Sequence, residues 1–209
     1  MRFLIPLLGL ALLACGDDPV DDTAAPVDTA ESDTDTDADV DSDTDADADS
    51  DTDTDPKAIG RDAVPFAMED INPSSASYGT TLRSEDLAGT PYALVFLDSR
   101  CTGCIDVADD LWALMLDKPH WHAALPVFGV ESYSAYATVP ATVDPMVENN
   151  DQPYVVDVEG SSVWAGYGAL NHDMLVISDD GVLDAWLPLY SWPDDMVIFT
   201  DYMTDRFGD

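Results

Sequence analysis

The stretch from Tyr92 to Cys104 constrains the fold most, because it joins an apolar run directly to two cysteines at C-x-x-C spacing. Residues 92–97 (YALVFL) have the length and the β-branched and aromatic content of a buried strand. From Ile105 to Leu116 the apolar residues recur at helical spacing. The sequence therefore predicts two thiols at the point where a buried strand leads into the N-terminus of a helix.

This position predicts a chemical role for the two cysteines. A helix N-terminus carries a partial positive charge and free N–H groups, which favour a thiolate, and Arg100 adds a positive charge beside Cys101. We expect Cys101 to be the exposed nucleophile and Cys104, one turn further on, to be the resolving thiol. Two sulfurs at this spacing can close a disulfide with little backbone movement. Because so small a loop gains little stability from chain entropy, redox chemistry explains the pair better than a static disulfide, which is the alternative.

The N-terminus has the pattern of a secretory signal over residues 1–14, with one basic residue before a short apolar core. That core is too short to cross the roughly 30 Å of a bilayer's hydrocarbon as a permanent helix. It ends in Leu-Leu-Ala followed by Cys15, which resembles the bacterial lipobox. The resemblance implies cleavage before Cys15 and attachment of lipid to it. We expect a lipid-anchored protein of the cell envelope, and Gly16 favours the outer membrane, with the protein facing the periplasm or the cell surface.

Residues 15–57 form an acidic, low-complexity segment in which Asp alternates with Thr, Ala, Ser and Val. Of the chain's 43 acidic residues, 18 lie between Asp17 and Asp55, where there is no Lys or Arg. Such a segment has little to bury and repels itself, so we predict a disordered linker. The Asp repeat over residues 33–55 lacks the Gly and Glu of calcium loops, and we expect no defined calcium site. The net charge of −36 disfavours nucleic acid as a partner.

Residues 58–209 are predicted to form one α/β domain with a mixed central sheet. Its central strands should begin at Tyr92, Leu125 and Met174, and residues 64–68 should add a short edge strand. Residues 81–89 suggest a turn of helix leading into the Tyr92 strand. The remaining strands are expected at 154–158 and 182–187, and the remaining helices at 142–148, 162–166 and 193–206.

The motifs together resemble the thioredoxin superfamily, and in particular its redoxin branch of exported thiol–disulfide proteins. The resemblance covers roughly residues 59–207 and is carried by residues 87–91, 95–97, the C-x-x-C itself, 154–157, 167–168 and 174–182. It implies a three-layer α/β sandwich, protein thiols and disulfides of the cell envelope as partners, no cofactor, and Cys101 and Cys104 as catalytic residues.

The sequence departs from the family's pattern around the cysteines. Arg100 stands where thioredoxins carry an aromatic residue, and Thr102-Gly103 stands where many have Gly-Pro. The place of the family's cis-proline, which faces the active sulfurs, falls at His172 or Asp173. We therefore count these five residues as supporting residues of the site.

Two alternatives to disulfide exchange remain open, copper binding and a binding module without catalysis. Cys101, Cys104 and His172 resemble the copper site of the SCO family of copper-delivery proteins, and two thiols with an imidazole suit Cu(I). Peroxidase chemistry is disfavoured, since Asp98 holds the position where peroxiredoxins place Thr or Ser. The domain can also be a binding module without catalysis. His120 and His122 are interpreted as surface residues of a loop rather than as metal ligands.

Overall fold

The structure is a computed structural model that describes residues 55–148, 150–159 and 162–208. The predicted signal peptide, Cys15 and nearly all of the acidic linker lie outside these residues. Within the described part of the chain, no helix is both long enough and apolar enough to cross a membrane.

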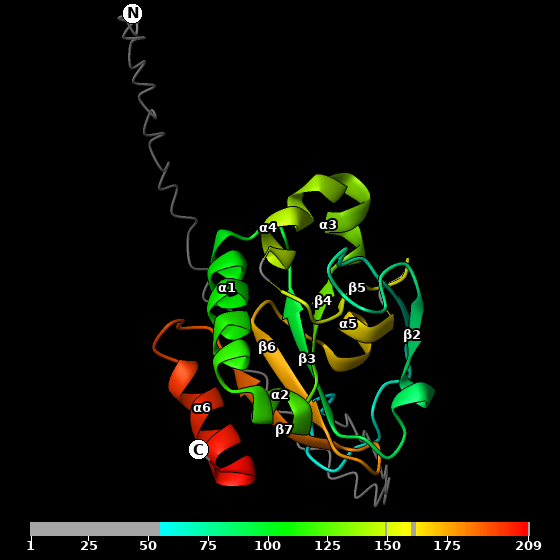
Figure 1. Ribbon diagram of the computed structural model, residues 1–209. Helices are drawn as coiled ribbons and strands as arrows, with labels where there is room; N and C mark the ends of the chain where they lie inside the picture. Colours follow the sequence, from blue (N-terminus) through cyan, green and yellow to red (C-terminus); the bar gives the residue numbers. More distant parts are fainter. Residues whose placement is uncertain (1–54, 149, 160–161, 209) are drawn as a thin grey trace, which may run out of the picture. The chain divides into compact units, whose positions relative to one another are not determined.

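The described residues form a mixed seven-stranded sheet in the order β2-β1-β5-β4-β3-β6-β7 (Figure 1). The strands are β1 (Ala67–Asp70), β2 (Thr81–Arg83), β3 (Tyr92–Leu97), β4 (Val127–Glu131), β5 (Tyr154–Val156), β6 (Asp173–Ile177) and β7 (Leu183–Pro188). Strand β3 pairs in parallel with β4 and antiparallel with β6. The three strands predicted to be central do lie side by side in the middle of the sheet.

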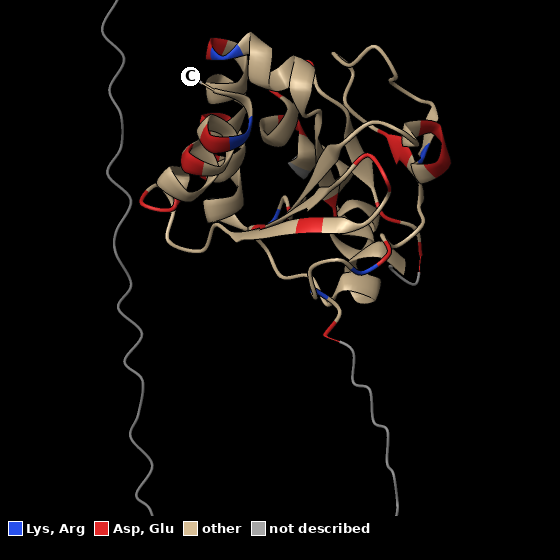
Figure 2. Cartoon of the chain, turned by 90° about the horizontal axis from the view of Figure 1, so that it is seen from below, with Lys and Arg blue, Asp and Glu red and all other residues tan. Residues whose placement is uncertain are grey.

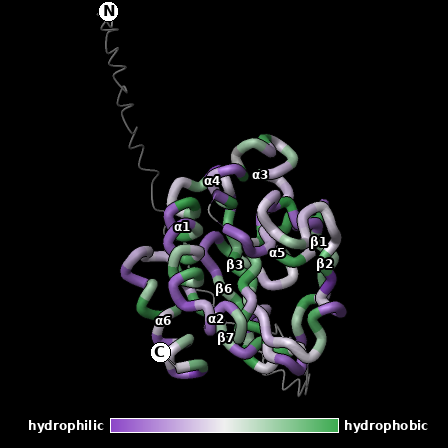
Figure 3. Tube along the Cα trace, in the orientation of Figure 1, coloured by the Kyte–Doolittle hydropathy of each residue, from purple (hydrophilic) through white to green (hydrophobic). Residues whose placement is uncertain are grey.

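Every residue of β3 is buried, because helices or packed chain cover both faces of the sheet. Side chains alternate between the faces of a strand. Ala93, Val95 and Leu97 belong to one apolar core, and the intervening Tyr92, Leu94 and Phe96 belong to the other. Figure 3 shows that the central strands are mostly hydrophobic. Together the two cores give the three-layer sandwich that the sequence predicts.

The helices divide between these two cores. The α-helices are α1 (Thr102–Asp117), α2 (Pro119–Ala124), α3 (Tyr133–Thr138), α4 (Asp144–Val147), α5 (Ser162–Tyr167) and α6 (Met196–Phe207), and the 3-10 helices are η1 (Ser84–Leu87) and η2 (Pro140–Val143). Helices α1, α2, α4 and α6 pack against the face that contains Val95. Helix α5 packs against the other face, through Val163 and Tyr167.

Three local predictions are corrected by the structure. The strand expected at 64–68 is β1, which begins later and lies inside the sheet, because β2 pairs outside it and takes the edge. Residues 81–83 are that edge strand, and only the following η1 is helical. His120 and His122 lie on helix α2 rather than in a loop, since Pro119 suits the first turn of a helix.

Candidate active site

The two cysteines lie where β3 leads into α1, as the sequence predicts. Cys101 is the N-cap residue of α1, and Cys104 lies on the first turn, where its N–H donates to the Cys101 carbonyl over 3.0 Å. Both thiols are free. Cys101 is half-buried, whereas Cys104 is fully buried beneath it. One sulfur is thus open to a partner, and the other is not.

The environment of Cys104 favours its neutral thiol. Burial raises the pKa of Cys104 well above that of a free thiol, and its interaction with Cys101 raises the pKa further. The backbone N–H of Asp98 partly opposes this by donating to Sγ over 3.5 Å. Cys104 therefore keeps its proton until a second thiolate is needed to react with the sulfur of Cys101.

His172 completes a group of three potential ligands. Its Nε2 lies 3.8 Å from the Sγ of Cys101. One ligand atom from each of Cys101, Cys104 and His172 lies within 4.8 Å of the other two. The ring also covers Gly103, where an added Cβ would lie only 3.3 Å from Cε1. Gly103 therefore leaves the space that the imidazole occupies.

The backbone of His172 is in a conformation that L-residues rarely adopt, with φ at 72°. Hydrogen bonds on both sides hold it there, because its N–H donates to the carbonyl of Phe96 over 2.8 Å and its carbonyl accepts from Leu189 over 3.0 Å. Burial lowers the pKa of His172, so the imidazole is neutral at neutral pH. A neutral imidazole can accept a hydrogen bond from a thiol, donate one to a thiolate through its N–H, or bind a metal.

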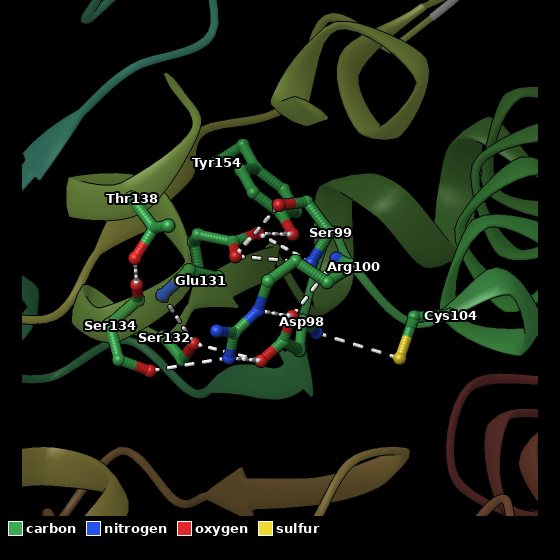
Figure 4. Close-up of polar contacts among 10 residues, drawn as sticks. Asp98, Ser99, Arg100, Cys104, Glu131, Ser132, Ser134, Thr138 and Tyr154 are labelled. Atoms are coloured by element: carbon green, nitrogen blue, oxygen red, sulfur yellow. Dashed lines mark hydrogen bonds and ion pairs between the residues drawn. The ribbon is translucent and has the colours of Figure 1, made fainter. Parts of the chain in front are cut away.

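The charge of Arg100 is paired with Asp98, as Figure 4 shows. The guanidinium makes hydrogen bonds of 3.0 Å and 2.6 Å to the two carboxylate oxygens of Asp98 and reaches Ser134 over 3.3 Å. The hydrogen bond from Arg100 is the main reason that the pKa of Asp98 lies below its usual value. Arg100 thus neutralises the acid beside the cysteines, whereas the sequence had suggested direct support of Cys101.

A buried carboxylate, that of Glu131, lies behind the loop that precedes Cys101 (Figure 4). It accepts hydrogen bonds from the Ser99 N–H over 3.0 Å and 3.2 Å, from the Ser99 hydroxyl over 3.1 Å and from the Tyr154 hydroxyl over 2.7 Å. Burial raises the pKa of Glu131, and these hydrogen bonds only partly offset the effect. The consecutive N–H groups of Asp98 and Ser99 therefore connect Cys104 on one side to Glu131 on the other.

The carboxylate of Asp173, next to His172, is also fully buried. It accepts from Lys57 Nζ over 2.6 Å, from the Leu170 N–H over 2.7 Å, from Trp186 Nε1 over 2.8 Å and from the Tyr190 hydroxyl. Burial alone would raise the pKa of Asp173, but these donors, Lys57 above all, hold it below its usual value. The charged carboxylate is therefore fully satisfied inside the protein.

The structure thus brings together three of the predicted site residues, Cys101, Cys104 and His172. Thr102 is the exposed first residue of α1. The Asp173 carboxylate accepts a hydrogen bond from the Leu170 N–H in the loop that contains His172. Sequence reasoning missed Glu131 and Lys57. The signal for Glu131 was present, because it is a charged residue at the end of the apolar run 127–130. Lys57 gave no such signal, since it pairs with a residue 116 positions away.

This architecture is that of a thioredoxin-like fold, with the cysteine pair at the N-terminus of the first long helix. No protein-family model and no curated protein matches the sequence. Among solved structures, the chain is similar to a thiol:disulfide interchange protein, DsbE, from Chlorobium tepidum, with a TM-score of 0.55 and 14% identity over 70% of this chain and 96% of that one.

Two further solved structures show how widely this fold is used. The thioredoxin domain of a thiol-disulfide oxidoreductase from Bacteroides vulgatus has a TM-score of 0.52 and 14% identity, over 69% of this chain and 96% of that one. The mitochondrial 2-Cys peroxiredoxin from Plasmodium falciparum has a TM-score of 0.52 and 13% identity, over 73% and 98%. At these identities the likeness establishes the fold, and the chemistry has to be argued from the site itself.

Proposed function

We propose that this protein is a thiol–disulfide oxidoreductase in which Cys101 is the nucleophile and Cys104 the resolving thiol. The observation that carries the proposal is the pair of free thiols at the start of α1, close together but unequal in exposure. The solved structures of similar fold support it, because two of those described above are thiol–disulfide proteins by name.

The chemistry requires no resident cofactor. The Cys101 thiolate attacks one sulfur of a partner's disulfide, so that a mixed disulfide forms and one partner thiolate leaves. Cys104 then loses its proton, and its sulfur attacks the Sγ of Cys101. This step closes the Cys101–Cys104 disulfide and releases the second partner thiolate, which takes up a proton. The partner gains two electrons and the protein loses them; the reverse sequence oxidises a partner dithiol.

A redox titration tests this function directly. The reduced full chain is equilibrated with mixtures of reduced and oxidised glutathione, and the thiol content of Cys101 and Cys104 is read by alkylation and mass spectrometry. We expect a single reversible two-electron transition in the parent and none in Cys101→Ser. Reduction of insulin disulfides should likewise depend on Cys101. A pair that stays reduced at every ratio would rule out the proposed exchange and leave a binding module.

We further propose that the protein works in the cell envelope, held to the outer membrane by lipid on Cys15 and raised from it by the acidic linker. The lipobox-like sequence before Cys15 supports this anchor, and its partners would then be exported protein thiols and disulfides. Growth with a labelled fatty acid should label the parent but not Cys15→Ser. Equal labelling of the two would show that Cys15 is not the lipidated residue.

Copper delivery is a second candidate, favoured by the position of His172. Two sulfurs and an imidazole nitrogen within 4.8 Å of one another form a soft donor set of the kind that Cu(I) prefers. Because burial lowers the pKa of His172, its ring is neutral and available as a ligand at neutral pH. Copper would be cargo here, held by the same three side chains that would otherwise exchange disulfides.

A Cu(I) titration in competition with a chromophoric chelator tests this second function. If copper is cargo, the reduced protein binds one Cu(I), and His172→Ala weakens binding by about tenfold, which corresponds to about 1.4 kcal/mol. His122→Ala on α2 is the matched control, since this histidine is also partly buried but belongs to a different part of the fold. Equal affinity in the parent and His172→Ala would remove His172 from the site.

A further inference from the structure

The carboxylate of Asp173 lies at the centre of a cluster that ties together three separate parts of the chain. We call Lys57, Asp173, Trp186 and Tyr190 the Lys57 clamp. The three side chains around Asp173 all donate to its carboxylate, and the ammonium of Lys57 also stands 4.6 Å from the centre of the Trp186 ring. The relative exposure of the Lys57 side chain is 9% and that of Asp173 is zero, so this is a buried ion pair.

Lys57 reaches this position from the first residues that the structure describes. It lies two residues after Asp55, the last acidic residue of the segment 15–57. The next residues are fixed to the sheet, since the Gly60 N–H donates to the Leu183 carbonyl and the Leu183 N–H donates to the Arg61 carbonyl, both over 2.8 Å. Lys57, where the acidic segment meets the domain, is therefore part of the folded structure.

The clamp also fixes the loop that presents His172 to the cysteines. The Asp173 carboxylate accepts from the Leu170 N–H, and the Asp173 N–H donates to the Leu170 carbonyl over 3.1 Å. These two bonds close the turn from Leu170 to Asp173, and His172 is the residue of that turn with positive φ. Its ring then lies 3.8 Å from the Cys101 sulfur.

We propose that Lys57 is a positioning residue for the thiol site: by neutralising Asp173 it holds the 170–173 turn and keeps His172 against Cys101. The inference deepens the proposed function and rests on it. It also assigns a role to the junction between the acidic segment and the domain. Lys57, at this junction, influences the reactivity of Cys101, which lies more than forty positions later in the sequence.

The expected consequence of removing the ammonium follows from the burial of the pair. A buried carboxylate that loses its cation is left uncompensated, which is costly. The turn that holds His172 then loosens, and the imidazole no longer lies beside the Cys101 sulfur, where its N–H can donate to the thiolate. Losing this donor slows the reaction of Cys101 with electrophiles and favours the disulfide over the dithiol.

The test compares Lys57→Met with Lys118→Met in the full chain. Lys118 is the matched control, because its ammonium also stands over a tryptophan ring, 5.2 Å from that of Trp121, but at the opposite end of α1 from Cys101. The first readout is the rate of Cys101 alkylation by iodoacetamide at pH 7, and the second is the equilibrium with glutathione. For Lys57→Met we expect the rate to fall by about threefold or more, and the equilibrium to shift toward the disulfide by a similar factor. Lys118→Met should match the parent.

A folded Lys57→Met protein with the parent's alkylation rate, or a faster one, overturns the inference. If that variant does not fold, Trp186→Phe decides, because it keeps a ring beside Lys57 and removes only the Nε1 donor to Asp173. It should slow alkylation in the same direction, and an unchanged rate overturns the inference. If instead the parent pair shows no reversible disulfide, the proposed function fails, while the alkylation comparison still reports on the clamp.

Discussion

The Nε2 of His172 lies 3.8 Å from the Sγ of Cys101, so an imidazole and a thiol that are 71 positions apart in the sequence share one site. The thiol comes from the start of α1, and the imidazole comes from the loop before β6, which pairs with β3. The charged groups nearby are paired with partners of their own, since Arg100 holds Asp98 and Lys57 holds Asp173. The site therefore presents a half-exposed sulfur beside a neutral ring.

The unequal exposure of the cysteines predicts which one forms the bond to a partner. Cys104→Ser leaves the half-buried Cys101 able to attack but removes the thiol that releases the partner. We expect this variant to accumulate a mixed disulfide with a peptide disulfide, visible by mass spectrometry, and Cys101→Ser to form none. Both should lose disulfide reductase activity by about a hundredfold or more. Trapping through Cys104 in the Cys101→Ser variant would reverse the assignment.

The backbone of His172 predicts a difference between two deletions of its side chain. At φ of 72° an L-residue is strained, whereas glycine is not. The free energy of unfolding of His172→Gly should therefore be about 1 kcal/mol higher than that of His172→Ala, although both variants lack the imidazole. Urea denaturation of the two variants measures this directly. Equal stability would indicate that the turn relaxes to negative φ once the imidazole is absent.

The contact between Gly103 and His172 predicts that one methyl group changes the site. A Cβ at position 103 would lie 3.3 Å from the imidazole Cε1, so Gly103→Ala should push the ring away from Cys101. We expect iodoacetamide alkylation of Cys101 to slow by about threefold, the effect of losing one modest hydrogen bond. Thr102→Ala, at the exposed neighbouring position, should leave the rate unchanged.

A double-mutant cycle shows whether this effect acts through the ring. If Gly103→Ala works by displacing the imidazole, it should have no further effect on the alkylation rate in a His172→Ala background. Additive effects of the two substitutions would mean that position 103 acts on the helix or on Cys101 directly.

The parts of the fold that the sequence predicts are those that local patterns determine. Residues 92–97 are apolar without interruption because β3 is buried on both faces, and the spacing from Ile105 matches the buried face of α1. The position of Cys101 at the helix start follows from these two elements alone. His172 was also found, because the likeness to a known family marks the place before the late strand.

The parts that were missed depend on pairings across the sheet or along the whole chain. Residues 64–68 were predicted to be an edge strand rather than an inner strand. The true edge strand, β2, escaped prediction because it is only three residues long and its pattern is polar. The pairing of Lys57 with Asp173 joins the first residues of the domain to the start of β6, 116 positions later, and no local pattern predicts it. Arg100 was placed beside Cys101, but its side chain turns to the acid two residues earlier.

The buried Glu131 predicts a pH dependence of stability whose sign can be worked out. Burial raises the pKa of Glu131 in the folded protein, so above the ordinary glutamate pKa the unfolded chain loses this proton before the folded one does. Stability from this group is therefore complete at pH below that ordinary value, and is lost as the pH rises through the raised pKa. Glu131→Gln should remove this loss, because an amide does not ionise.

Urea denaturation of the parent and of Glu131→Gln at a series of pH values from 4.5 to 8 measures the difference. We expect the free energy of unfolding of Glu131→Gln to increase relative to that of the parent as the pH rises. Glu85→Gln is the matched control, since Glu85 is exposed on η1, and its difference from the parent should stay flat. A Glu131→Gln difference that shrinks with rising pH would mean that the bonds from Ser99 and Tyr154 outweigh burial and stabilise the charged carboxylate.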